Sequence, residues 1–585
     1  MKKTIYTLLG LLLAAGLTSC QDWFIEKPEV TGMDQDEVFS TAKNAEGAIA
    51  EAYATILSSG LPVLVWNNSP IMPYETTEAI MGGEDLCRLT WGYMDKQVVA
   101  GMLANNENNG AGYTDDYFPN NYAYIRKAWL VYENIDKVAD MSDRDKAIVK
   151  AEMQVLVAFR YVEMLKRYGG VPLVESTLTT VDVRPRSTVQ QTLDFIVGLC
   201  DAAAATLEGV RWPADWLGRV NKGVALAVKA EALMYAARPL FNADAPYMQM
   251  ADPANNEMIW LGGYDAKRWE TARLANQEVI DWGKANGFEL IDTGDPITAV
   301  GTPSNREVLL AYKQQREADD NGIYKNYTFM PTHTGHDLGQ YRGTGYGQLC
   351  QYRKADGTDQ TWAGVDDWRP AGEYRDKAEE LEPRAQASLY FYGVNPKNNT
   401  GNSRWDLYQN WQLEYKWQDG WAKNIKFWYE AGSREWFEFP IYRMAEFYLN
   451  IAEAYNEEGN PTMALRYLND IRRRGGIPDE TQTDRVGLRR SIHREWAVEF
   501  YVENQWYPHA RHWKQGASMV GGAKYKFEFS QAAGVSWNPR KPEEFANYTR
   551  KPSYVPEYTW HERMSLSPFT LSEVNKGYLV QNPGY

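Results

Sequence analysis

The chain has 585 residues, enough for a large folded core, and a formal net charge of −15 at neutral pH. This acidic balance argues against non-specific nucleic-acid binding, which needs a basic surface. The chain also holds 22 Trp and 38 Tyr, more aromatic side chains than core packing alone requires. We expect at least half of them in the core and some at the surface, where flat rings bind sugars or other amphipathic ligands.

The N-terminus has the pattern of a lipoprotein signal peptide. Two lysines precede a short apolar run over residues 5–17, which falls short of the roughly 20 residues that span a bilayer. The run ends in the sequence LTSC at Cys20, which looks like a bacterial lipobox. We expect residues 1–19 to be removed, Cys20 to carry the lipid, and residues 20–40 to form a tether to the membrane. An ordinary signal peptide with an incidental cysteine is the alternative.

Helical hydrophobic periodicity recurs through the rest of the chain. It predicts helices over residues 43–57, 124–140, 147–168, 188–207, 223–237 and 268–283, and a further group from Tyr442 to about Trp513. A short strand is expected over 307–311. The stretches 58–122 and 291–436 lose most of this periodicity and are expected to be loop insertions. The tail after residue 513 is expected to be coil.

The clearest pattern lies between Tyr448 and Gly476. Apolar residues at positions 448, 451, 452 and 455 form one helical stripe, and those at 464, 468 and 471 form a second. Gly459 and Asn460 separate the two stripes as a C-terminal glycine and an N-cap. This is a helical hairpin of tetratricopeptide type, which needs stacked neighbours to bury its apolar face. The sequence predicts an all-α fold in which tetratricopeptide-like helical hairpins form a right-handed scaffold with large irregular loop insertions.

Six blocks, in order, resemble the SusD/RagB family of outer-membrane lipoproteins. They are Val38–Thr41, Asn44–Leu57, Glu152–Leu173, Gly218–Tyr235, Arg443–Pro478 and the C-terminal QNPGY at residues 581–585. The sequence departs from the family pattern over Glu503–His512 and at residues 568–570. The resemblance implies one SusD-like domain over 41–585, with an N-terminal part over about 41–240 and a C-terminal part over about 265–585.

The resemblance also implies a function. The family suggests a non-catalytic glycan-binding lipoprotein on the surface of a Gram-negative outer membrane. Its partner would be a SusC-like TonB-dependent transporter, to which it hands captured oligosaccharides. A peptide-capturing lipoprotein with the same scaffold and partner is the first alternative, and a purely structural interaction protein is the second. The sequence has no nucleophile elbow, phosphate loop or HExxH, so we expect no enzyme.

Sugar binding uses aromatic faces for the apolar side of a pyranose ring, and amide, carboxylate or guanidinium groups for its hydroxyls. Both loop stretches offer this combination. The candidate glycan-binding residues are Trp66, Asn67, Asn68, Trp91, Tyr93, Tyr117, Tyr341, Arg342, Trp362 and Trp368. The sugar hypothesis weakens if the four tryptophans among them are all buried.

Two His-x-x-His pairs, His333 with His336 and His509 with His512, invite a metal interpretation. Neither pair has a further His or Cys at ligand spacing, so we expect no transition-metal site and no cofactor. Asn- and Asp-rich loops could supply oxygen ligands for a structural Ca²⁺, although no EF-hand spacing is present. The three cysteines after Cys20 form neither a disulfide framework nor a zinc pattern.

Overall fold

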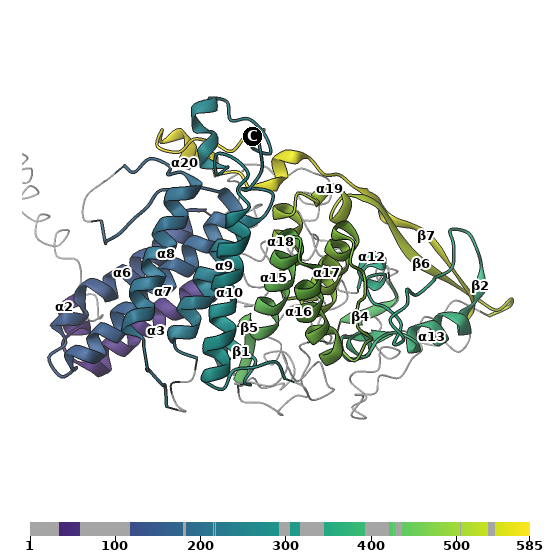
Figure 1. Cartoon of the computed structure of the whole chain (residues 1–585), viewed down its shortest axis with the longest axis horizontal. Coiled ribbons are helices and arrows are strands. Elements are labelled where there is room, and N and C mark those ends of the chain that lie inside the picture. The colour runs from purple at the N-terminus through teal and green to yellow at the C-terminus, as the bar shows by residue number, and fades with distance from the viewer. Residues whose placement is uncertain are drawn as a thin grey trace, which may run out of the picture.

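The computed structural model describes residues 34–58, 118–178, 183–213, 216, 218–291, 305–315, 344–391, 420–424, 426, 436–503, 505–535 and 545–585. Within these residues, long α-helices stand side by side in one part of the molecule, and short helices and β-strands form the other part (Figure 1). No helix in these ranges has the length and apolarity needed to cross a membrane.

The helical part is built from helices that pack in chain order. They are α2 (Gln35–Val38), α3 (Ala42–Ser58), α6 (Phe118–Asn134), α7 (Asp143–Tyr168), α8 (Val189–Thr206), α9 (Lys222–Ala237), α10 (Lys267–Ala285), α15 (Met444–Glu457), α16 (Pro461–Arg474) and α17 (Arg485–Glu499). Each contacts the next, and α15 also contacts α17. The helices predicted from periodicity are confirmed, although α6 and the 3₁₀ turn η1 (Ile135–Lys137) start and end earlier than the predicted 124–140.

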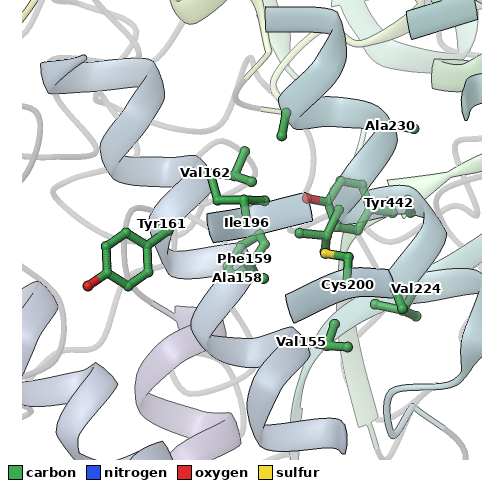
Figure 2. Close-up of a cluster of buried hydrophobic side chains, with 14 of the residues drawn as sticks. Val155, Ala158, Phe159, Tyr161, Val162, Ile196, Cys200, Val224, Ala230 and Tyr442 are labelled. Carbon is green, nitrogen blue, oxygen red and sulfur yellow. The ribbon is translucent and has the colours of Figure 1, made fainter. Parts of the chain in front are cut away.

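Apolar side chains from neighbouring helices interlock in the centre of this part (Figure 2). The residues labelled there are Val155, Ala158, Phe159, Tyr161 and Val162 on α7, Ile196 and Cys200 on α8, Val224 and Ala230 on α9, and Tyr442 on strand β5 (Trp436–Arg443). The same continuous cluster extends from Phe39 to Leu579, so both ends of the described chain contribute to one core. Burial raises the pKa of the Cys200 thiol well above its usual value, which keeps this side chain neutral and apolar.

The hairpin predicted between Tyr448 and Gly476 is confirmed by α15 and α16. Gly459 has φ +79°, and the N–H of Asn460 donates to the carbonyl of Tyr455 at 2.8 Å, as in a Schellman motif. The side chain of Asn460 then caps α16 by accepting from the N–H of Met463 at 3.2 Å.

Small β-sheets correct the strict all-α prediction, although the described fold is mostly helical. β1 (Val308–Gln315) pairs antiparallel with β5 (Trp436–Arg443), and β3 (Leu389–Phe391) with β4 (Ala422–Asn424). The third sheet has the order β2 (Arg369–Pro370), β7 (Phe545–Tyr558), β6 (Gly522–Gln531). The tail is therefore not coil, because β6 and β7 form a long hairpin away from the helical part (Figure 1).

Short helices also correct the prediction that 291–436 is loop apart from one short strand. They are α12 (Tyr346–Leu349), α13 (Ala371–Glu379) and α14 (Pro383–Ser388). Tyr374 of α13 contacts Phe527 and Phe529 of β6 with ring centroids 5.5 and 5.3 Å apart. These contacts form a second, smaller core between α13 and the hairpin.

The C-terminal segment, which contains α18 (Trp506–His512), α19 (Gly516–Met519) and α20 (Leu571–Asn575), ends against the end of α7. Phe569 stacks on Tyr168 with centroids 5.0 Å apart. Buried Asn582 donates to the carbonyl of Tyr168 at 3.2 Å and accepts from Arg186 at 2.8 Å. The QNPGY block thus has a structural role, since it fixes the last residues of the chain to the helical part.

Candidate functional site

A pocket of about 420 Å³ opens where the helical part meets the β1–β5 pair. Four segments line it: the α8–α9 connection, the end of α10, the residues leading into and along β1, and β5. Its aromatic and polar lining residues are Arg211, Trp212, Arg219, Asn221, Trp282, Asn286, Phe288, Asn305, Arg306, Lys313 and Glu438. We call it the Trp212–Trp282 pocket. Its volume lies within the roughly 300–1,000 Å³ usual for small-molecule sites.

The end of α10 places two aromatic rings at the pocket. Gly287 has φ +88° and lies just beyond the helix, where the N–H of Phe288 donates to the carbonyl of Gly283 at 2.8 Å. This turn stacks Phe288 on Trp282 with ring centroids 5.8 Å apart. Gly223 of α9 faces the same indole so closely that a Cβ there would lie 2.0 Å from the ring. The position of Trp282 is therefore fixed by its neighbours.

Arg219, in the α8–α9 connection, lies against two indole rings. Its guanidinium is 4.1 Å from the ring centroid of Trp212 and 4.8 Å from that of Trp216. Its Nε donates to the buried carboxylate of Glu152 at 2.7 Å, and its Nη2 donates to the second oxygen. Burial raises the pKa of Glu152, while hydrogen bonds from Arg219 and Tyr53 act against that rise. These contacts hold the guanidinium and the Trp212 ring in one orientation.

Polar side chains join the segments around the pocket. Lys313 of β1 pairs with Glu438 of β5 at 2.8 Å. Arg211 donates to Asn286 at 3.3 Å and so links the α8–α9 connection to the end of α10. Gly218 has φ +102°, and a Cβ at this position would lie 2.6 Å from the Lys313 side chain. The close approach of backbone and lysine depends on this glycine.

The chemistry of this lining suits a sugar. Trp212, Trp282 and Phe288 supply aromatic surface for the C–H faces of a pyranose ring, while guanidinium, amide, ammonium and carboxylate groups supply hydrogen bonds for its hydroxyls. The pocket combines apolar walls with a few polar groups, as small-molecule sites usually do.

A second pocket of about 460 Å³ differs in character. It lies between α6, the residues 172–178 and 183–184, and the C-terminal segment around α20. The described residues that line it include no tryptophan. The hydroxyl of Tyr122 donates to the carbonyl of Pro172 at 2.9 Å, and that of Tyr578 donates to Glu573. Its lining is largely apolar, so it fits a sugar less well than the Trp212–Trp282 pocket does.

Most of the residues predicted to bind a glycan lie outside the described part of the chain. These are Trp66, Asn67, Asn68, Trp91, Tyr93, Tyr117, Tyr341 and Arg342. The lipidation residue Cys20 and the pair His333 and His336 also lie outside it.

The two described candidates, Trp362 and Trp368, do not line the Trp212–Trp282 pocket. Trp362 is half-buried and contacts the rings of Tyr374 and Phe527 at 5.6 and 5.4 Å between centroids. Trp368 is 43% exposed and directly precedes β2, which pairs with β7. Because Trp368 is exposed, the four candidate tryptophans are not all buried, so the sugar hypothesis is not weakened by that criterion.

His509 and His512 occupy a buried aromatic cluster. The His509 ring lies 4.3 Å from that of Trp496, and the His512 ring lies 4.5 Å from that of Tyr235. In the described part of the chain, no group of three or more His, Cys, Asp or Glu side chains is placed to hold a metal ion.

Sequence reasoning missed Trp212 and Trp282. Trp212 lies in the Pro-containing connection RWPADWLGR, which carries no helical period, and Trp282 lies near the end of the predicted helix 268–283. The only local signal is the Asn-Gly pair after Trp282, which predicts a turn and hence a return of Phe288 toward the helix.

Two family models match the chain. The SusD family model matches residues 306–585, and a SusD-like model described as "starch-binding associating with outer membrane" matches residues 90–231. The chain belongs to the SusD family. The resemblance seen in the six sequence blocks is thereby confirmed. A search of curated proteins found no significant match.

Solved structures of SusD-like proteins share the fold of this family member. A SusD-like protein from Bacteroides fragilis is 22% identical with a TM-score of 0.68, and the match covers 94% of this chain and 98% of the other. A SusD-like carbohydrate-binding protein from the same species is 17% identical with a TM-score of 0.65, covering 93% and 99%. A SusD superfamily protein from Parabacteroides distasonis is 16% identical with a TM-score of 0.58, covering 92% and 99%. None of these descriptions supports the peptide alternative.

Proposed function

We propose that this protein is a non-catalytic, cell-surface glycan-binding lipoprotein that captures oligosaccharides and hands them to a TonB-dependent outer-membrane transporter. The observation that carries the proposal is the Trp212–Trp282 pocket, where fixed aromatic rings stand beside guanidinium, amide and carboxylate groups. The descriptions of the family models and of the SusD-like carbohydrate-binding neighbour support the same ligand class.

Residues outside the described ranges complete the proposal. Lipid on Cys20 would hold the protein at the outer membrane, in line with the description of the matching family model. In this arrangement the stacked hairpins form a right-handed, tetratricopeptide-like scaffold, and a SusC-like transporter receives the sugar. The loop residues from Trp66 to Tyr117 and Tyr341 with Arg342 remain predicted contributors to a longer binding surface.

The test is a titration of a soluble form, residues 21–585, with a panel of plant, microbial and host oligosaccharides, followed by intrinsic Trp fluorescence and by calorimetry. We expect saturable binding of one class. Trp212→Ala should weaken that binding at least tenfold, a loss of about 1.4 kcal/mol, because the ring supplies stacking surface and holds Arg219.

Trp368→Ala is the matched control, since it removes an exposed tryptophan that does not line the pocket. Thermal melting of both variants should show a folded protein. Weaker binding in Trp368→Ala together with normal binding in Trp212→Ala would move the site to the β2–β7 region. No binding of any oligosaccharide, with saturable binding of mixed peptides, would overturn the proposal.

A further inference from the structure

The Trp212–Trp282 pocket carries an unusual charge for this chain. The whole sequence has a formal net charge of −15, yet four basic residues and one acidic residue line the pocket in the described part of the chain. The basic residues are Arg211, Arg219, Arg306 and Lys313, and the acidic residue is Glu438. A local excess of positive charge in an acidic protein indicates a ligand of the opposite charge.

Three of the four basic groups are neutralised by carboxylates of the chain itself. Arg219 pairs with buried Glu152, and Lys313 pairs with Glu438 at 2.8 Å. The third, Arg306, pairs with Glu289 at 2.8 Å, and both of these side chains are more than half exposed. These pairs orient the cations but leave little net charge for a ligand.

Arg211 is the exception. It is exposed, and its one hydrogen bond within the described ranges goes to the neutral amide oxygen of Asn286 at 3.3 Å. No carboxylate in the described part of the chain forms an ion pair with it. Among the described residues, the pocket therefore has one net positive charge, which lies next to Trp212 on the side of Asn286.

We infer that the Trp212–Trp282 pocket selects acidic oligosaccharides. In this binding mode an anionic group attached to the sugar ring pairs with Arg211, while the face of the sugar lies on the tryptophan rings. This rests on the proposed function. A carboxylate at C5 of a uronic acid projects from the ring edge, so the ring can stack on an indole while the carboxylate reaches sideways to a guanidinium. The planar fork of arginine binds such a carboxylate through two parallel hydrogen bonds. A neutral sugar forms no such ion pair.

The test compares each acidic oligosaccharide with its own carboxyl-reduced form. Trimers of galacturonic, glucuronic and mannuronic acid and their reduced neutral counterparts are titrated into residues 21–585 by calorimetry at low and at high salt. We expect at least one acidic trimer to bind at least tenfold more tightly than its reduced partner, and this difference to shrink as salt screens the charge. A sulfated neutral trimer tests whether a sulfate ester serves equally well as the oxyanion.

Arg211→Gln should weaken binding of the acidic trimer about tenfold and leave binding of the reduced trimer unchanged. Arg490→Gln, which removes the same charge from an exposed position on α17, should change neither. Equal binding of acidic and reduced forms, or an equal effect of Arg211→Gln on both, would overturn the inference while leaving the proposed glycan function intact. Failure of every sugar, acidic or neutral, would instead overturn the proposed function.

Discussion

Arg443, at the end of β5, contacts three buried carboxylates. Its Nη1 lies 2.9 Å from Glu307 and 2.7 Å from Glu499, and its Nε lies 2.7 Å from Glu503. These four side chains are at most 4% exposed, and the guanidinium also lies 3.9 Å from the ring centroid of Phe500. Charges removed from water to this extent are tolerated because each has a partner.

Removal of Arg443 should therefore be costly. Arg443→Leu leaves Glu307, Glu499 and Glu503 buried with one cation fewer, and we expect the free energy of unfolding to fall by about 3–5 kcal/mol. Urea unfolding followed by far-UV circular dichroism measures this change. Arg473→Leu is the control, since Arg473 is 56% exposed and pairs with Asp470 and Asp479 at the surface, where a loss of about 0–1 kcal/mol is expected. Similar losses in both variants would contradict a special role for the buried cluster.

The run Arg472–Arg474 shows which interactions of a single residue a sequence pattern can predict. Positive charge at the C-terminus of a helix suits the helix dipole, and the exposed Arg473 fits that prediction. Arg474, however, is buried and pairs with Glu307, 167 residues away, at 2.6 Å. Local periodicity carries no information about a partner so distant, so the ion-pair network could not be predicted from the sequence.

At the scale of elements, local signals predicted α15 and α16 well because stripe, glycine and N-cap all lie within one short stretch. The β6–β7 hairpin was missed although β6 alternates Tyr525, Phe527 and Phe529 with charged residues, which is a strand pattern. Proline within β7 favoured the coil interpretation. In the structure Pro552 lies opposite Tyr525 where the register shifts, so the ladder continues around it.

The close contact of α9 and α10 at Gly223 gives a prediction at this scale. Gly223→Ala would place a Cβ 2.0 Å from the Trp282 ring, so the indole or the helix must shift. We expect a loss of about 1–3 kcal/mol in unfolding free energy and weaker glycan binding, because Trp282 lines the pocket. Thermal melting and calorimetric titration measure the two effects.

Gly198→Ala on α8 provides the matched control. A Cβ at Gly198 meets nothing within 4 Å, so this variant should gain about 0.5–1 kcal/mol from helix propensity and bind glycan normally. If Gly223→Ala were as stable as Gly198→Ala, the packing explanation for Gly223 would be wrong.

At the scale of the whole molecule, the pocket exists only in the folded chain. Trp212, Trp282, Lys313 and Glu438 come from four segments. Trp212 lies in the region matched by one family model, Lys313 and Glu438 lie in the region matched by the other, and Trp282 lies between the two matched regions. The sequence indicated aromatic sugar-binding chemistry, but the choice among 22 tryptophans depends on which segments meet. Counting aromatic residues led to candidates in the two loop insertions, whereas this pocket is lined by the end of α10 and the short α8–α9 connection.

A buried histidine cluster also joins the regions that the two family models match. His493 on α17 stacks on Trp513 with centroids 3.6 Å apart. His512 on α18 contacts the ring of Tyr235 of α9, and its Nε2–H donates to the carbonyl of Lys166 on α7 at 2.9 Å. Burial lowers the pKa of His493, His509 and His512 well below the ordinary value of 6.5, and Arg238 lowers each of them further. The lowered pKa values favour neutral rings in the folded protein at neutral pH.

This cluster predicts loss of stability in mild acid. The unfolded chain binds a proton on each of the three histidines near pH 6.5, while the folded chain binds them only at much lower pH, so stability is fully present above about pH 6.5 and falls as pH drops below it. Each histidine contributes a slope of about 1.4 kcal/mol per pH unit. Burial raises the pKa of Glu446 well above its usual value, so this group lowers the stability as the pH rises above the unfolded value of about 4.5 and thus opposes the histidines.

Urea unfolding at pH 7.5, 6.5, 5.5 and 5.0 measures the net slope of the unfolding free energy against pH. His509→Phe, which keeps an aromatic ring beside Trp496, should reduce this slope by about 1.4 kcal/mol per pH unit. An unchanged slope in His509→Phe would mean that the ring is protonated in the folded protein, and the acid sensitivity would then have to come from other groups.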